Sequence, residues 1–125
     1  MKSESGKSAL NPSGHYSQAI IHNDLIYVSA QLAIDLDTGE KQFGKIEDEA
    51  ERVLKNIELI LKDAGSDRNR IIRTTAYITN ISLWDDLNEV YRKFFGSHKP
   101  ARTVIAVKEL HFGFKVGIEA IASVV

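Results

Sequence analysis

The amino-acid sequence predicts an α+β domain in which two helices pack on one face of a β-sheet. The chain has 125 residues, which is a usual size for one domain. Its β-prone runs and two amphipathic runs follow one another in the order β-β-(β)-α-β-α-β-β. Several expected strands are apolar on both alternating faces, although two helices can cover only one face of a sheet. The second face needs another cover, and a partner subunit is the simplest one.

Each strand is expected where a run of β-branched, aromatic and other apolar residues lies between turn residues. The first two runs are separated by His22-Asn23-Asp24, which is typical of a hairpin turn. A turn-rich stretch between residues 37 and 44 has room for one short further strand. The predicted strands cover residues 16–21, 25–31, 71–79, 101–107 and 116–124.

The two helices are predicted from apolar residues that recur at every third or fourth position. Residues 46–64 have such a stripe, and Gly65 is a typical residue for the end of a helix. The acidic residues 47–49 suit the positive end of the helix dipole, and we expect them on a solvated face. The second helix is expected to start at residues 82–85, a capping-box-like Ser-Leu-Trp-Asp, and to stop at Gly96.

The polar, turn-prone residues 1–13 predict a flexible N-terminal arm, followed by a single domain over residues 14–125. Sixteen Lys and Arg against 17 Asp and Glu give a net charge of -1, without the basic excess that nucleic-acid binders show. No run is long and apolar enough for a transmembrane helix, and the first residues lack the apolar core of a signal peptide. We therefore expect a soluble, cytoplasmic protein with no membrane partner and no nucleic-acid partner.

Several kinds of catalytic site are excluded by residues that the sequence lacks. There is no cysteine, so thiol catalysis, disulfides and cysteine zinc sites are not possible. There is neither a Gly-x-Gly-x-x-Gly dinucleotide fingerprint nor a Gly-x-Ser-x-Gly nucleophile elbow. The four histidines are scattered without metal-ligand spacing. No metal and no cofactor is therefore expected.

Two charged residues and one aromatic residue remain as candidates for a site. Arg102 opens an apolar strand, and Glu119 lies inside the apolar run of the last strand, where an unpaired carboxylate is costly to bury. Tyr16 follows Gly14 at the start of the first predicted strand. Arg102 and Glu119 can form a structural ion pair across neighbouring strands, or they can form a small site for a substrate with both charges. The spacing of the residues leaves both readings open.

Seven short stretches have the sequence, order and spacing of one protein family. They are Gly14-His15-Tyr16-Ser17-Gln18-Ala19, Val28-Ser29-Ala30-Gln31, Asp37-Thr38-Gly39-Glu40, Arg73-Thr74-Thr75, Asn88-Glu89-Val90-Tyr91, Pro100-Ala101-Arg102-Thr103 and Ile118-Glu119-Ala120-Ile121-Ala122. On these stretches the chain resembles the reactive intermediate deaminase family, also called the Rid or YjgF-like family, from about residue 14 to residue 124.

The resemblance implies a chorismate-mutase-like α+β fold and a homotrimer with clefts between its subunits. It also implies hydrolysis of 2-imino acids and their enamine tautomers to 2-keto acids and ammonia, without a cofactor. The substrates would be 2-aminoacrylate with its tautomer 2-iminopropanoate, and 2-iminobutanoate. By position, Arg102 would bind the substrate carboxylate and Glu119 would act near the imine and its attacking water. The pocket would be lined by Tyr16, Ser29 and Asn88.

The chain departs from the common pattern of the family at several positions, and two other functions stay open. It has His15, Ala30 and Val104 where proline, glycine and cysteine are usual, and its loop at residues 111–114 is aromatic. A non-catalytic trimer that binds 2-keto acids is the main alternative, and the altered loop favours it. RNA cleavage or translation inhibition is the third hypothesis, and the near-neutral charge argues against it.

Overall fold

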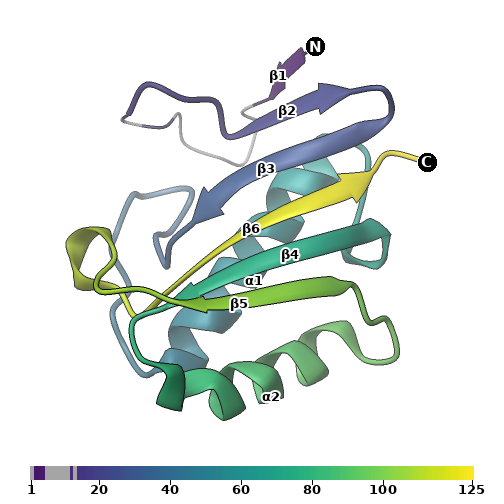
Figure 1. Cartoon of the computed structure of the whole chain (residues 1–125). Helices are drawn as coiled ribbons and strands as arrows, with labels where there is room; N and C mark the ends of the chain where they lie inside the picture. The colour runs from purple at the N-terminus through teal and green to yellow at the C-terminus, as the bar shows by residue number, and fades with distance from the viewer. Residues whose placement is uncertain (1, 5–11, 13) are drawn as a thin grey trace.

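The computed structural model describes residues 2–4, 12 and 14–125. These residues form one mixed sheet with the strand order β1-β2-β3-β6-β4-β5, together with two α-helices (Figure 1). The α+β class and the two-helix architecture that the sequence predicted are confirmed. The elements are β1 (Lys2–Glu4), β2 (Ala19–His22), β3 (Leu25–Gln31), α1 (Ile46–Asp63), β4 (Ile71–Ile78), α2 (Trp84–Phe95), β5 (Ala101–Ala106) and β6 (Val116–Ser123).

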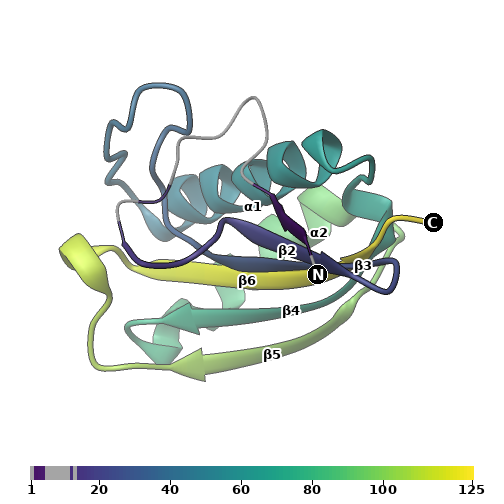
Figure 2. The same ribbon diagram turned by 90° about the horizontal axis from the view of Figure 1, so that it is seen from above.

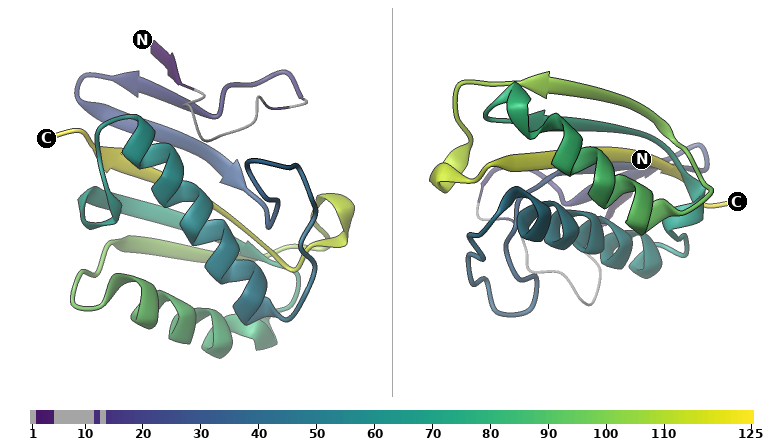
Figure 3. Two further views of the ribbon diagram at one scale, coloured as in Figure 1. Left: turned by 180° about the vertical axis from the view of Figure 1, so that it is seen from behind. Right: turned by 90° about the horizontal axis from the view of Figure 1, so that it is seen from below.

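Both helices lie on the same face of the sheet, and no helix formed by the described residues lies over the opposite face (Figures 2 and 3). The hydrophobic core fills the space between the helices and the sheet. Leu54 and Ile57 of α1 and Leu87 of α2 are fully buried there, together with Ile26 and Ile118 of the sheet. Burial of one such side chain stabilises the fold by about 1.5–3 kcal/mol. We call the helix-covered side of the sheet the helix face and the other side the open face.

The first strands differ from the prediction in where they start. The hairpin is confirmed, because Asn23 and Asp24 both have positive φ angles, 51° and 65°, as a type I′ turn requires. However, β2 starts at Ala19 and not at residue 16, because the amide of Tyr16 donates to the carbonyl of Gly14 in a tight turn. The short strand expected between residues 37 and 44 is reduced to a single bridge, Ile34 to Lys41.

The predicted N-terminal arm lies mostly outside the described residues, which do not include 1, 5–11 or 13. Lys2–Glu4, by contrast, form a strand that pairs antiparallel with β2. The unpaired backbone groups of an edge strand offer such a segment its hydrogen bonds, whatever its own β-propensity. A long-range pairing of this kind cannot be predicted from the composition of the segment.

Helix α1 agrees with the prediction except at one of its acidic residues. Glu49 was expected on a solvated face, but its side chain is fully buried. One carboxylate oxygen accepts from the amide of Lys115 at 2.8 Å, and the other accepts from the amide of Gly44 at 3.3 Å. The ammonium of Lys115 lies 3.6 Å from the same carboxylate. Glu49 therefore joins the start of β6 to the loop that precedes α1.

Helix α2 begins differently from the capping box that the sequence suggested. A short 3₁₀ turn, Ile81–Leu83, precedes it, and the side chain of Asn80 accepts from the amide of Ser82 at 2.9 Å. The sequence suggested Ser82 as the capping residue, but Asn80 has this role and the Ser82 amide is the group that it caps. The end of the helix is as expected, because Gly96 has a φ of 65°, which a glycine adopts without strain.

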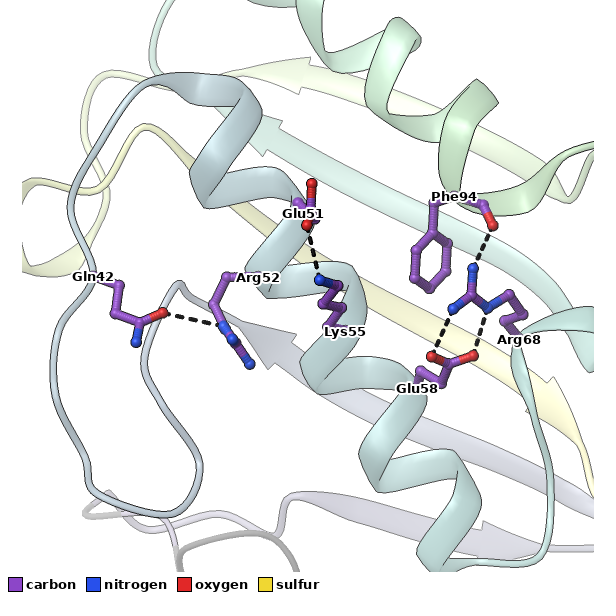
Figure 4. A network of polar contacts seen from close by, with 7 residues as sticks. All are labelled: Gln42, Glu51, Arg52, Lys55, Glu58, Arg68 and Phe94. Atoms are coloured by element: carbon purple, nitrogen blue, oxygen red, sulfur yellow. Dashed lines mark hydrogen bonds and ion pairs between the residues drawn. The ribbon is translucent and has the colours of Figure 1, made fainter.

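An arginine joins the two helices on their outer side (Figure 4). The guanidinium of Arg68 donates to both carboxylate oxygens of Glu58 on α1 and, at 2.6 Å, to the carbonyl of Phe94 on α2. It also lies 3.9 Å from the centre of the Phe94 ring, a cation–π distance. Among the residues that the structure describes, no helix is long and apolar enough to cross a membrane.

The Arg68–Glu58 pair predicts how stability depends on pH. The hydrogen bond from Arg68 holds the pKa of the Glu58 carboxyl below its ordinary value of 4.5. The contribution of the pair is therefore complete above pH 4.5 and is lost as the pH falls through the lower, folded-state value. In urea titrations between about pH 6 and pH 3, Glu58→Gln should lose less stability on acidification than the wild type does.

A matched control for this prediction lies on the same helix. Glu51 pairs with Lys55 at 2.8 Å, but its side chain is 59% exposed, so solvent screens the pair. Glu51→Gln should leave the acid dependence close to that of the wild type. Equal acid dependence in Glu58→Gln and wild type would contradict the assignment to Arg68.

Candidate active site

Arg102 is held on the helix face by two aromatic rings. It lies on β5 beside Thr74 of β4, to which β5 is parallel. Its guanidinium carbon is 4.8 Å from the ring centre of Tyr91 and 5.1 Å from that of Trp84, both on α2. Such contacts orient a guanidinium and leave its N–H groups free for an anion. Within residues 14–125, no carboxylate forms a salt bridge with Arg102.

The Tyr91 ring that supports Arg102 is itself held by a hydrogen bond to the sheet. Its hydroxyl and that of Thr74 are hydrogen-bonded at 2.8 Å, and Thr74 is fully buried. Burial raises the pKa of Tyr91 to about 12, although the bond to Thr74 and the charge of Arg102 act in the opposite direction. The phenol is therefore neutral at physiological pH, and it gives Arg102 a rigid and uncharged support.

A pocket of about 470 Å³ opens beside Arg102, between the end of α2 and the start of β5. Asn88, one of the predicted lining residues, is in its wall. The Nε2 of His98, another wall residue, donates to the carbonyl of Ile71 at 2.8 Å, which fixes the loop before β5. A pocket of this size suits a small metabolite, and Arg102 gives it a positive charge.

Glu119 lies on the opposite side of the sheet, on the open face. It pairs in register with Thr75 of β4, and its Oε1 accepts a hydrogen bond from the hydroxyl of Tyr77. On its other side, the pairing of β3 with β6 is interrupted by a bulge between Val28 and Gln31. The carboxylate is therefore flanked by a tyrosine and by an irregular stretch of β3.

Ser29 lies in this bulge and connects it to the start of the domain. Its hydroxyl donates to the carbonyl of Ser17 at 2.7 Å, and its amide donates to the carbonyl of Gln18 at 2.9 Å. Tyr16, which is 55% exposed, precedes these two residues. The segment with Tyr16 is thus held against the bulge that faces Glu119.

The predicted site residues therefore fall into two groups on different faces of one sheet. Arg102 and Asn88 are on the helix face, whereas Glu119 is on the open face, next to the β3 bulge that contains Ser29. Tyr16 precedes the two residues that bond to Ser29. Strand β4 separates β5 from β6, so the ion pair across neighbouring strands that the sequence allowed for Arg102 and Glu119 does not form. Neither group alone brings a cation and a carboxylate to one small molecule.

Sequence reasoning missed the residues that hold the two charges in place. These residues are Tyr77, Trp84, Tyr91 and Thr74. Tyr91 was named only within a stretch that carries the family resemblance, and Trp84 only at the expected start of the second helix. Trp84 and Tyr91 are seven residues apart, a spacing that puts both rings on one face of that helix, but the contact of Tyr77 depends on the β4–β6 register.

Comparison with known proteins identifies the family. Residues 6–124 match the family model described as endoribonuclease L-PSP. The chain belongs to this family, the Rid family. The sequence resemblance to Rid proteins is thereby confirmed, and the match covers the predicted domain almost completely.

Relatives in three organisms are similar to the chain over most of its length. The RutC family protein y4sK of Sinorhizobium fredii is 44% identical over 110 residues, which are 88% of this chain and 87% of that protein. The human 2-iminobutanoate/2-iminopropanoate deaminase is 38% identical over 109 residues, 87% of this chain and 80% of that protein. The solved structure of the Rid family protein YyfA of Yersinia pestis has a TM-score of 0.92 and 38% identity, with 98% of both chains covered.

Proposed function

We propose that this Rid protein hydrolyses small 2-imino acids and their enamine tautomers to 2-keto acids and ammonia. The proposed substrates are 2-aminoacrylate with 2-iminopropanoate, and 2-iminobutanoate. The observation that carries the proposal is Arg102 at the wall of a metabolite-sized pocket, a guanidinium to which residues 14–125 supply no carboxylate partner. The similarity to the human protein named as a deaminase of these imines supports it.

Arg102 can bind the carboxylate that all of these substrates share. A planar guanidinium donates two parallel, charge-assisted hydrogen bonds to a carboxylate, and this fixes the orientation of the ligand as well as its position. The rings of Trp84 and Tyr91 hold the guanidinium before the substrate arrives, so less conformational entropy is lost on binding. The small alkyl group of the substrate fits a pocket of this volume.

Glu119 can serve the chemical step at the other end of the substrate. A carboxylate stabilises the protonated imine, whose carbon is far more electrophilic than that of the neutral imine. It can also take a proton from water as the oxygen adds to that carbon, and general-base catalysis of this kind typically contributes 10²–10⁴-fold. When the proton passes to nitrogen, the C–N bond breaks, ammonia leaves and the carbonyl group forms. The balance requires only water, so no cofactor is needed.

A complete site requires a second copy of the chain in this proposal. Arg102 and Glu119 lie on different faces of one sheet, so one small molecule can contact both only if they come from different subunits. We propose a homotrimer with such clefts, in which Tyr16, Ser29 and Asn88 complete the lining. The open face, with Ile105 41% exposed, is suited to contact between copies.

A coupled assay tests the proposed reaction. A pyridoxal-phosphate-dependent lyase would generate 2-aminoacrylate from serine, and pyruvate formation would be followed with and without this protein. We expect pyruvate to appear faster when the protein is added, and a 2-keto acid to inhibit the reaction competitively. If the folded oligomer binds 2-ketobutyrate saturably but does not change the rate of hydrolysis, the protein is a binding protein and the proposed reaction is wrong.

A further inference from the structure

We infer that Tyr77 is a positioning residue for Glu119, which it holds in place by donating its hydroxyl proton to one carboxylate oxygen. The inference rests on the proposed function, in which Glu119 acts on the attacking water. The hydrogen bond itself is independent of that function, because it lies within one chain and joins two neighbouring strands. The hydrogen bond and the proposed function can therefore be tested separately.

The β4–β6 register explains why these two side chains meet. Glu119 is directly opposite Thr75, and Tyr77 is two residues further along β4 on the same face of the sheet. Tyr77 is thus the diagonal neighbour of Glu119, within reach of a long side chain. The residue directly opposite Tyr77 is Gly117, which has no side chain to compete for this space.

Among residues 12 and 14–125, only Tyr77 hydrogen-bonds the Glu119 side chain: its hydroxyl donates to Oε1, and Oε2 receives no hydrogen bond from these residues. The other titratable side chains on the open face of the two flanking strands are Arg73 and Tyr27. The guanidinium of Arg73 donates to the hydroxyl of Thr103, so it is directed toward β5 and away from β6. The carboxylate thus has one fixed oxygen and one oxygen that is free to accept a proton from water.

The acidity of Tyr77 is consistent with this role. The hydrogen bond to Glu119, together with burial and the charge of the carboxylate, raises the pKa of the Tyr77 phenol above its ordinary value of 10.0. The phenol therefore keeps its proton at neutral pH and stays a donor.

Tyr77→Phe removes the hydroxyl and keeps the ring, and Tyr27→Phe is its matched control. Tyr27 lies on the same open face, on β3, where it pairs with Ile121 of β6. Its hydroxyl has no hydrogen-bond partner among the described residues, so its removal should change neither of the two measurements below. Both variants keep the apolar ring, so both should fold and assemble as the wild type does.

The first measurement is the ¹³C NMR chemical shift of the Glu119 side-chain carboxyl at neutral pH, with the signal assigned from Glu119→Gln. In Tyr77→Phe this signal should move away from its wild-type position, because the carboxylate has lost its donor. In Tyr27→Phe it should stay at the wild-type position. If the Glu119 signal has the same position in Tyr77→Phe and in the wild type, the inferred hydrogen bond is overturned, whether or not the protein is a deaminase.

The second measurement is turnover of 2-aminoacrylate in the coupled assay. We expect kcat of Tyr77→Phe to fall about tenfold, the size expected for one hydrogen bond to a charged group. KM should change little, because Arg102 and not Glu119 binds the carboxylate of the substrate. A changed Glu119 chemical shift with unchanged kcat would overturn the positioning role. A wild type without activity would overturn the proposed function, and the chemical shift would then still decide whether Tyr77 holds Glu119.

Discussion

Arg102→Ala is expected to lower kcat/KM for 2-imino acids by roughly 10²- to 10³-fold, the effect of removing one partner from a hydrogen-bonded charge pair. The substrate loses both its charge partner and the two donors that orient it. Arg102→Lys should recover only part of the loss, because an ammonium keeps the charge but not the planar pair of donors. Steady-state kinetics in the coupled assay measure all of these values.

Arg92→Ala is the control for a general loss of positive charge in the same pocket. Arg92 also lines the pocket, but its side chain is 69% exposed and already pairs with Glu89. Its removal should change kcat/KM by less than about threefold, since exposed ion pairs are worth little. Wild-type kinetics in Arg102→Ala, with an intact fold, would show that another group binds the substrate carboxylate.

Glu49→Ala is expected to cost roughly 2–4 kcal/mol of unfolding free energy, because it leaves buried donors without an acceptor. The amides of Lys115 and Gly44 both donate to this carboxylate, and the substitution also removes the partner of the Lys115 ammonium. In addition, the negative charge lies in the first turn of α1, where it interacts favourably with the helix dipole. Urea denaturation at neutral pH measures the loss.

Glu47→Ala provides the comparison for this stability prediction. Glu47 is in the same first turn and has the same charge, but its side chain is exposed. Its removal should cost no more than about 1 kcal/mol, the usual size of a dipole interaction at the surface. If both variants lose the same stability, the buried hydrogen bonds of Glu49 contribute nothing beyond its charge.

The elements of the fold could be predicted because they depend on local patterns. The apolar stripe of α1 and the two left-handed residues of the β2–β3 turn follow from short stretches of sequence. The burial of Glu49 could not be predicted in this way, since one of its partners, Lys115, lies just before β6 and more than sixty residues further along the chain. By sequence pattern alone, Glu49 resembles its exposed neighbours Glu47 and Asp48.

In the candidate site, too, single residues could be predicted from the sequence and their arrangement could not. Arg102 and Glu119 stand out in the sequence as charges in apolar strands, but their relation depends on strand order. β4 lies between β5 and β6, and its adjacent residues Thr74 and Thr75 pair with Arg102 and Glu119. Because adjacent residues of a strand point to opposite faces, the two charges are on opposite faces of the sheet. The contacts of Tyr77 and Tyr91 likewise need the register of β4 with its neighbours and the position of α2.

The placement of the two charges on opposite faces has a consequence for mixtures of variants. In the proposed trimer each cleft takes its guanidinium from one chain and its carboxylate from the next. An oligomer of only Arg102→Ala chains, or of only Glu119→Gln chains, then has no intact cleft. When the two inactive proteins are unfolded together and refolded, some clefts will combine an unaltered Arg102 with an unaltered Glu119. Two inactive proteins should therefore complement each other, and a site contained within a single chain could not produce this result.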